Sequence, residues 1–393
     1  MSEWKEYNLG EMGYLKRGKS KHRPRYAFHL YGGHYPFIQT GDIKAASKYI
    51  TQYTQTYSEA GLAQSKLWPS GTLCITIAAN IAEIALLKFD ACFPDSVIGF
   101  IPNESKCDLN FVFYIMKYFQ RELQAQAIGS VQDNINIGTF DNIKFPFPLL
   151  PEQRVIASIL SSLDDKIDLL HHQNKTLEAL AETLFRQWFV EEAVQINNIK
   201  LFNLVEVIDN RGKTPIYSKE KTPYPIIEVK SLASADRFVD YEACEKFISA
   251  DIYDTFFRDG HPEINDILFA TVGSIGEMAF VIENKGAIAQ NVVALRANNI
   301  SPFYLYQYLA LSSTRNKIKD LDIGAVQPSI KVPHLLDVEI PIPSYKSKIG
   351  EFDELLKPIF YKMKTNHFQI RTLKQLRDTL LPKLMSGEVR VKT

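Results

Sequence analysis

The chain is an internal duplication, because blocks of its first half return in the same order in its second half. Arg-Gly-Lys at 17–19 returns at 211–213, and Phe-Pro-Phe-Pro at 145–148 returns as Ile-Pro-Ile-Pro at 340–343. Four more blocks repeat in order, at 35–38 and 224–227, 76–85 and 271–279, 128–132 and 323–327, and 176–184 and 372–380. The offset stays between 189 and 196 residues. A duplication across 393 residues predicts two similar domains rather than one core.

Each half has the same order of predicted structure, a globular segment followed by a long helix. The globular segments, 1–149 and 194–343, contain short β-type runs such as 73–77 and 292–295, and helical runs such as 111–119. A Pro-x-Pro sequence ends each segment, and we expect it to stop regular strand pairing because proline has no N–H to donate. The predicted fold class is therefore α+β, with two similar domains of mixed α and β structure.

A long amphipathic helix is predicted after each globular segment, at 150–193 and 344–393. Pro151 and Glu152 suit the first turn of the first helix, and the rise from Pro151 to Phe189 is roughly 58 Å. Apolar residues spaced by three and four mark one buried face on each helix. They are Ile156, Ile159, Leu163, Ile167, Leu170, Leu177, Leu180 and Leu184 in the first helix, and Leu356, Ile359, Met363, Ile370, Leu373 and Leu380 in the second.

Neither apolar face is stable in water, so we predict that the two helices pack against each other. The duplication implies a pseudo-twofold axis, which predicts an antiparallel coiled coil that separates the two domains as a spacer. The alternative is a dimerisation hairpin that sets no distance. Pro358 lies inside the second helix and is expected to kink or interrupt it, and Gly387 suits its end.

Composition narrows the class of protein. Lys plus Arg equals Asp plus Glu, at 45 each, which weakly opposes DNA binding by this chain alone but permits it where basic groups cluster or partners supply more. Cys74, Cys92, Cys107 and Cys244 have no zinc-site spacing and are expected to be buried, reduced thiols. We see no signal-peptide pattern and no apolar run of roughly 18 residues, so we expect a cytoplasmic protein without a membrane partner.

Several motifs resemble those of the specificity subunits of type I restriction–modification systems. They are Pro-Leu-Leu-Pro-Glu-Gln-Arg at 148–154, Leu-Asp-Asp-Lys-Ile at 163–167, Gly-x-Val-Gln at 129–132 and 324–327, and Leu-Pro-Lys-Leu-Met-Ser-Gly at 381–387. The resemblance covers the whole chain. It is specific in the helices and turn motifs and weak inside the globular segments.

This resemblance implies two target-recognition domains, each binding one half of a split, asymmetric site in double-stranded DNA. It implies that the chain is not catalytic and binds no cofactor. The implied partners are two adenine methyltransferase subunits that use S-adenosylmethionine, and restriction (motor-nuclease) subunits that use ATP and Mg²⁺. The chemistry, including flipping of the target adenine, then belongs to the partners. The alternative is a coiled-coil scaffold without sequence-specific DNA binding, which does not explain two duplicated but locally divergent domains.

The basic segment near the start of the chain is the best electrostatic candidate for DNA contact. Its members are Arg17, Lys19, Lys21, Arg23 and Arg25, and Arg211 and Lys213 are the equivalents in the second half. Such side chains bind phosphates, and an arginine fork also binds guanine. The alternative is a solvated loop without a ligand. Small polar residues in matched loops, Thr76, Asn80, Thr271 and Ser274, are equally candidates for base contacts or for structural turns.

An enzyme is the rival class, but its signals are weak. Asp95 and Glu104-Ser105-Lys106 superficially match a metal-dependent nuclease pattern, yet the repeat places Gln290 opposite Asp95. We find no methyltransferase motif of the Asn/Asp-Pro-Pro-aromatic type and no phosphate-binding loop of the P-loop type. His171 and His172 on the first long helix have no acidic pair at ligand spacing, so we expect them to face solvent or a partner.

Overall fold

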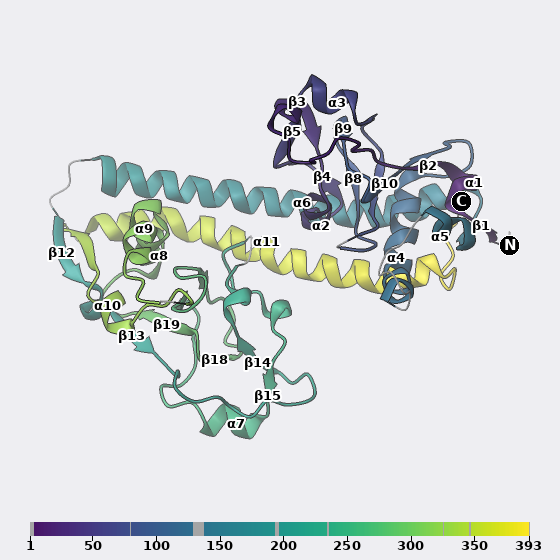
Figure 1. The fold of residues 1–393 in the computed structure, drawn as a ribbon. Coiled ribbons are helices and arrows are strands. Elements are labelled where there is room, and N and C mark those ends of the chain that lie inside the picture. Colours follow the sequence, from purple (N-terminus) through teal and green to yellow (C-terminus); the bar gives the residue numbers. More distant parts are fainter. Residues whose placement is uncertain are drawn as a thin grey trace. The chain divides into compact units, whose positions relative to one another are not determined.

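The computed structural model describes residues 4–78, 80–128, 137–192, 196–233, 236–324, 326–345 and 347–392. The chain divides into two units, many of whose elements are labelled in Figure 1. Unit 1 comprises residues 1–167 and 372–393, and unit 2 comprises residues 168–371. Each of the two long helices, α6 (Leu150–Arg186) and α11 (Ser347–Met385), therefore contributes one part to each unit.

Unit 1 combines short strands with helices. Before α6 its elements are β1 (Lys5–Tyr7), α1 (Leu9–Met12), β2 (Gly13–Arg17), η1 (Phe28–Leu30), β3 (Tyr31–Phe37), α2 (Thr40–Ala45), β4 (Tyr49–Ile50), β5 (Gln55–Tyr57), α3 (Glu59–Ala63), β6 (Leu67–Trp68), β7 (Leu73–Thr76), β8 (Ile84–Leu87), β9 (Ala91–Cys92), β10 (Val97–Pro102), α4 (Leu109–Ile128), α5 (Ile137–Asn142) and β11 (Phe145–Phe147).

The main sheet of unit 1 has the strand order β2-β10-β7-β8-β4. Strands β7 and β8 are buried along their whole length, as expected for short apolar runs inside a core. Helix α4 packs on this sheet, since Phe111 and Ile115 share one hydrophobic cluster with Leu73 and Ile84. A second sheet has the order β5-β3-β9-β6.

Unit 2 has a closely similar set of elements. They are the π-helical turn η2 (Gln187–Glu191), β12 (Ile196–Lys200), η3 (Leu201–Asn203), β13 (Val205–Ile208), β14 (Tyr224–Ile227), η4 (Val229–Ser231), η5 (Tyr241–Ala243), β15 (Phe247–Ile248), α7 (Ala250–Thr255), β16 (Ile267–Ala270), β17 (Met278–Phe280), β18 (Ala287–Ile288), β19 (Val292–Ala297), α8 (Pro302–Ala310), α9 (Ser312–Lys319), α10 (Val332–Leu336) and β20 (Glu339–Pro343).

The duplication in the sequence is also a duplication in topology. The sheet β13-β19-β16-β17 of unit 2 repeats the order β2-β10-β7-β8 of unit 1. The sheet β15-β14-β18 repeats β5-β3-β9, with β14 and β18 parallel just as β3 and β9 are. The prediction of two similar domains of mixed structure is therefore confirmed.

The two Pro-x-Pro segments form strands, so the prediction that they stop regular pairing is wrong. Strand β11 pairs antiparallel with β1, and β20 pairs antiparallel with β12. Each pair is a sheet of only two strands, so each strand has an outer edge without a neighbouring strand. A proline is tolerated there because no N–H is needed for pairing on that edge. The pairs also bring the start and the end of each globular segment together.

The two long helices pack antiparallel within each unit. In unit 1, Ile156 and Leu160 near the start of α6 share a core with Leu384 near the end of α11. In unit 2, Phe185 near the end of α6 packs on Phe352 near the start of α11, with ring centroids 5.7 Å apart. This is the antiparallel arrangement that the repeat predicts. Within the described part of the chain, no helix is long and apolar enough to cross a membrane.

The packed face of the helices follows the predicted stripe with one exception and several additions. Ile156, Ile167, Leu170, Leu356, Met363 and Ile370 are buried, while Ile159, Leu163, Leu177, Leu184, Ile359, Leu373 and Leu380 are half-buried. Leu180 is 45% exposed, because the packed face passes through Ala181 and Phe185 instead. Two polar residues missed by an apolar pattern, Asn174 and Asn366, are buried in it and joined by a hydrogen bond of 2.8 Å.

A kink or an interruption is predicted at Pro358. Helix α11 is continuous through this residue, so the predicted interruption is wrong. Proline removes one N–H and leaves the carbonyl oxygen of Glu354 without its helical donor. Both Pro358 and Glu354 are exposed, so water can bind that oxygen. Packing of Phe352, Leu356 and Phe360 on both sides of the proline stabilises the helix.

Candidate nucleic-acid interface

The backbone that follows β2 passes close to the segment before β10. Arg17 ends β2, and its Nε donates a hydrogen bond of 2.8 Å to the carbonyl oxygen of Asp95. At Gly18, a Cβ would lie 2.4 Å from the carbonyl oxygens of Phe93 and Pro94. Only glycine fits this approach, which explains why a glycine follows the arginine.

Arg25 and Asp95 form an ion pair at the same place. Arg25 Nη2 donates to both carboxylate oxygens of Asp95, at 2.9 and 3.0 Å. The superficial nuclease pattern does not assemble into a site, because Asp95 binds this arginine and Lys106 donates to the carbonyl oxygen of Glu11 at 2.9 Å. Asp95 is therefore a positioning partner for DNA-contact candidates, a role that its sequence position did not indicate.

The other predicted cations of this segment face outward. Lys21 and Arg23 are exposed, and Lys19 is half-buried. Arg23 Nη1 donates hydrogen bonds of 2.8 Å to the carbonyl oxygens of Ser20 and His22, which hold its guanidinium against the backbone. The stretch from Arg17 to Arg25 thus carries five basic residues, of which Arg25 pairs with the Asp95 carboxylate. Phosphate binding by these side chains stays a prediction.

Thr76 is wrong as a base-contact candidate. Its side chain is fully buried, and its Oγ1 donates to the carbonyl oxygen of Asn80 and accepts a bond of 2.9 Å from the N–H of Glu83. The hydroxyl closes the turn between β7 and β8. Asn80 is half-buried and its Oδ1 accepts from Lys44 at 3.2 Å, so its base contact stays a prediction.

In unit 2, the equivalent arginine is partly neutralised. Arg211 donates to the two carboxylate oxygens of Asp209 at 2.8 and 2.7 Å. Burial alone would raise the pKa of Asp209, but the bonds from Arg211 outweigh it and lower this pKa, so the pair is charged at neutral pH. Thr271 is fully buried and donates to the carbonyl oxygen of Asn291, so it is also wrong as a base contact. Lys213 is exposed.

The Gly-x-Val-Gln segment of unit 2 forms an exposed loop with a fixed base. The Asp322 carboxylate accepts hydrogen bonds of 2.8 Å from the N–H groups of Gly324 and Ser329, which lower the pKa of Asp322. A Cβ on Gly324 would lie 1.9 Å from the carbonyl oxygen of Gln327, so glycine is required there. Val326 and Gln327 are exposed at the tip.

This loop packs beside the turn that carries Ser274. Gly273 N–H donates to the carbonyl oxygen of Pro328 at 2.8 Å, and Ser274 itself is exposed. The base contact of Ser274 stays a prediction. The matching Gly-x-Val-Gln segment at 129–132, and Ala79 in the Thr76 loop, lie outside the described residues.

Two histidines of the long helices contact one buried carboxylate of unit 2. Asp236 is 4% exposed; its Oδ1 lies 3.0 Å from His171 Nδ1 on α6, and its Oδ2 lies 3.5 Å from His367 Nδ1 on α11. The 171–172 pair is expected to face solvent or a partner; His172 is exposed, while His171 is 30% exposed and also contacts Asp236. Sequence spacing could not reveal the contact, because Asp236 comes from a distant loop.

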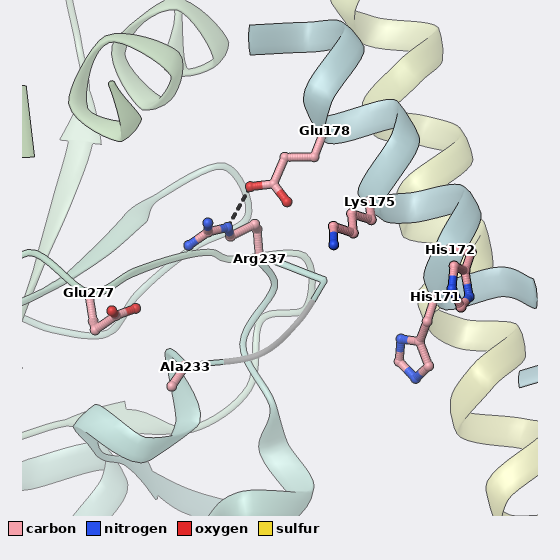
Figure 2. Close-up of a pocket in the computed structure, with 7 residues that line it drawn as sticks. All are labelled: His171, His172, Lys175, Glu178, Ala233, Arg237 and Glu277. Atoms are coloured by element: carbon pink, nitrogen blue, oxygen red, sulfur yellow. Dashed lines mark hydrogen bonds and ion pairs between the residues drawn. The ribbon is translucent and has the colours of Figure 1, made fainter. Parts of the chain in front are cut away.

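A cavity of about 480 Å³ lies beside this cluster, between α6 and the loops of unit 2. Figure 2 shows its lining, with Lys175 and Glu178 on α6 facing the loop of Arg237, and Glu277 on the far wall. Arg237 Nε donates to the Glu178 carboxylate at 2.5 Å. Carboxylates and cations thus balance across the cavity, and the ion pair joins the loop of Arg237 to helix α6.

Replacing Asp236 with alanine should destabilise unit 2 by about 1–3 kcal/mol, because the side chains that contact its buried carboxylate lose their partner. Burial alone would raise the pKa of Asp236, but the two histidines outweigh it and hold this pKa below its usual range. The carboxylate therefore stabilises the fold at pH above about 4, and this contribution is lost as the pH falls through the lower folded value. Urea unfolding at several pH values measures the difference.

Asp337→Ala is the matched control, since Asp337 is exposed in its pair with Lys200 and should change stability little. A difference between wild type and the Asp236 variant that stays constant from neutral pH to well below pH 4 would assign the loss to packing and contradict the role of the charge.

The cysteines and potential metal ligands show no catalytic arrangement in the part of the chain that is described. Cys74, Cys92, Cys107 and Cys244 are buried and unpaired, which confirms their predicted burial. Burial raises the pKa of Cys107 to about 11, so this thiol stays protonated at neutral pH. Among the described residues, no group of three or more His, Cys, Asp or Glu is placed to hold a metal ion.

One family model matches the chain twice, at residues 1–179 and 194–370, and its description is the type I restriction modification DNA specificity domain. The chain belongs to this family. It is a specificity subunit of a type I restriction–modification system with two target-recognition domains, and DNA binding follows from the family. The resemblance seen in the sequence motifs is confirmed.

Relatives of similar length support the assignment along the whole chain. The MjaIX specificity subunit of Methanocaldococcus jannaschii is 24% identical over 388 residues, which cover 92% of this chain and 88% of the relative. The HindI specificity subunit of Haemophilus influenzae is 21% identical and covers 99% of this chain and 100% of its own. The crystal structure of the S subunit of a type I restriction–modification system from M. genitalium has the same fold, with a TM-score of 0.59 at 18% identity over 97% of this chain and 96% of that one.

Proposed function

We propose that each unit of this specificity subunit binds one half of a two-part, asymmetric sequence in double-stranded DNA. The observation that carries the proposal is the shared strand order of the two units combined with different surface loops. The stretch from Arg17 to Arg25 carries five cations, one of them paired with Asp95, whereas the segment after β13 carries Arg211 paired with Asp209 and an exposed Lys213. Equal scaffolds with unequal loops suit two different half-sites.

We propose further that the chain catalyses no reaction and acts with partners. Its net charge is zero, and Arg25 and Arg211 are both bound to carboxylates, so phosphate contacts by this chain alone are few. Two adenine methyltransferase subunits with S-adenosylmethionine would add affinity and chemistry, and restriction subunits would add ATP- and Mg²⁺-dependent cleavage. The complex would act in the cytoplasm, where its DNA lies.

A scaffold that binds proteins and not DNA is the second candidate. The zero net charge and the long helices fit a scaffold as well as they fit a DNA-binding subunit. A scaffold, however, assigns no role to the exposed basic segment between β2 and β3. Binding of the assembled complex to a duplex with its methylated motif and to a scrambled duplex, at moderate salt, separates the two candidates. A scaffold would bind both duplexes alike.

We also propose that the lengths of α6 and α11 set the number of unread base pairs between the half-sites. Inserting seven residues after Ile167 and seven after Arg371 adds about 10 Å to each helix and preserves the spacing of the packed face. At about 3.4 Å per base pair, the gap in the methylated motif should widen by about three. Long-read sequencing of methylated adenines in cells that express the complex measures the gap.

Two controls belong to this experiment. A seven-residue insertion after Glu220, which lies in an exposed loop, should leave the gap unchanged. An insertion in α6 alone should abolish methylation, because it moves one helix two turns past its partner. An active complex with both helices lengthened and an unchanged gap would contradict the spacer.

A further inference from the structure

Two aromatic side chains stand almost fully in solvent on the basic segment of unit 1. Tyr26 is 85% exposed and Phe28 is 94% exposed, while Leu30 two residues later is 2% exposed. Single exposed apolar residues are common on protein surfaces, but two large aromatic rings so close together and so free of contact are not. Their exposure needs a reason in the assembled state of the protein.

The backbone that carries these rings is fixed on both sides. Tyr31 Oη donates to the carbonyl oxygen of Arg25 at 2.9 Å, and Ser58 Oγ donates to the carbonyl oxygen of His29 at 2.6 Å. The N–H of Leu30 donates to Ala27 at 3.0 Å. The loop therefore presents the two rings from a folded base, at a small conformational cost for any ligand that they contact.

The charges around the rings are those that a nucleic acid requires. Lys21 and Arg23 are exposed on the same segment, and Arg25 lies directly before Tyr26. Cations beside an exposed ring bind phosphates while the ring contacts the bases, as in proteins that insert apolar side chains between base pairs. A protein partner would need an acidic surface with an apolar pocket for the rings. The rest of the segment shows no further feature that such a partner would bind.

The corresponding loop of unit 2 has an apolar residue in a similar state. Ile216 is 78% exposed in the segment between β13 and β14, three residues after the exposed Lys213. The segment between β2 and β3 is its topological equivalent. The two units thus share an exposed apolar tip next to a cation, although the residues differ.

We propose that Tyr26 and Phe28 insert into duplex DNA at the half-site bound by unit 1 and unstack one base step, and that Ile216 does so at the other half-site. The inference rests on the proposed reading of DNA by each unit. Pyrimidine–purine steps unstack most easily, so the contacted step should be of this type. Unit 1 would then select part of its sequence through the deformability of DNA, beyond its hydrogen bonds to base edges.

The test uses the full chain in complex with its methyltransferase subunits, and duplexes that carry the methylated motif with 2-aminopurine placed at each position in turn. Wild type should raise the 2-aminopurine fluorescence at one step of the unit 1 half-site that does not include the methylated adenine, because flipping of that adenine by the methyltransferase raises the signal by itself. The double variant Tyr26→Ala/Phe28→Ala should abolish this rise and weaken specific binding on the order of 5- to 150-fold. The salt dependence of binding should not change, because no charge is removed.

Two comparison variants separate the rings from the charges and from exposure in general. Phe202→Ala removes another exposed phenylalanine on a short helical turn, 67% exposed in η3, and should bind as wild type does. Arg23→Ala should keep the fluorescence rise and reduce the slope of log affinity against log salt by about 0.9.

Three outcomes overturn the inference. The first is a double variant that binds with wild-type affinity. The second is the absence of a fluorescence rise with wild type at every position of the unit 1 half-site other than the methylated adenine. The third is a double variant that no longer co-purifies with its methyltransferase subunits, which would assign the rings to a protein contact and explain weaker DNA binding without insertion. Wild type without any sequence preference would instead overturn the proposed function itself.

Discussion

Exchanging residues 1–149 for the matching segment of a relative should replace one half of the methylated DNA sequence completely and leave the other half and the gap unchanged. The segment contains both strands of the β1–β11 pair, in which Lys5 lies opposite Phe147, and it ends where α6 begins. The exchanged domain therefore brings its own closure and its own contact loops. Long-read sequencing of methylated adenines should show loss of the original motif and one new motif.

The reciprocal exchange of residues 196–343 is the matched control and should replace only the other half. It contains the β12–β20 pair, in which Ile196 lies opposite Pro343. A change in both halves after a single exchange would contradict independent reading by the two units. Loss of all methylation in both chimaeras, with intact complexes, would do so too.

Replacing Asp164 with alanine should destabilise unit 1 by about 3–5 kcal/mol, which is the largest effect that we expect from a single substitution. Asp164 is 8% exposed, and its carboxylate accepts hydrogen bonds from Tyr114 Oη at 2.6 Å and from Arg377 Nη1 at 2.8 Å. Burial, together with the carboxylate, raises the pKa of Tyr114, so its hydroxyl stays a donor. Alanine removes the buried acceptor of Tyr114 and Arg377, and the guanidinium keeps only Asp378, whose side chain is 62% exposed. Urea unfolding followed by tryptophan fluorescence measures the loss.

The neighbouring Asp165 is exposed and supplies the control, because Asp165→Ala should change stability little. Asp164→Asn keeps the shape and one acceptor oxygen but removes the charge, so its loss should lie between those of the two alanine variants. Equal stability of the Asp164 and Asp165 alanine variants would show that the buried network contributes nothing.

The duplication in the sequence predicted most of the fold. Repeated blocks predicted the repeated strand order, and the spacing of Ile156, Leu356 and their neighbours predicted the packed helices. Both signals are local or periodic, and periodicity reports burial directly. The family motif at 163–167 also contains Asp164, although the pattern alone did not show that this aspartate binds the end of the other helix.

The candidate site was predicted less well, because its geometry depends on contacts between distant residues. Thr76 and Thr271 are small and polar in matched loops, but each hydroxyl closes a turn inside the protein. Asp95 looked like a metal ligand and instead binds Arg25, and Asp236 reaches His171 from a loop 65 residues away. Such contacts depend on which face of a strand or turn each side chain occupies, and the composition of the chain does not determine this.

The amide pair between Asn174 and Asn366 has a consequence for how the helices align. A pair of this kind inside an apolar seam weakens it slightly, since the Asn366 Oδ1 has no hydrogen-bond partner. Any slip of one helix by a turn would set each amide against hydrocarbon, at a greater loss. The pair therefore lowers the stability of the helix packing in unit 2 slightly and favours a single register of the two helices. Pairings shifted in register are disfavoured during folding.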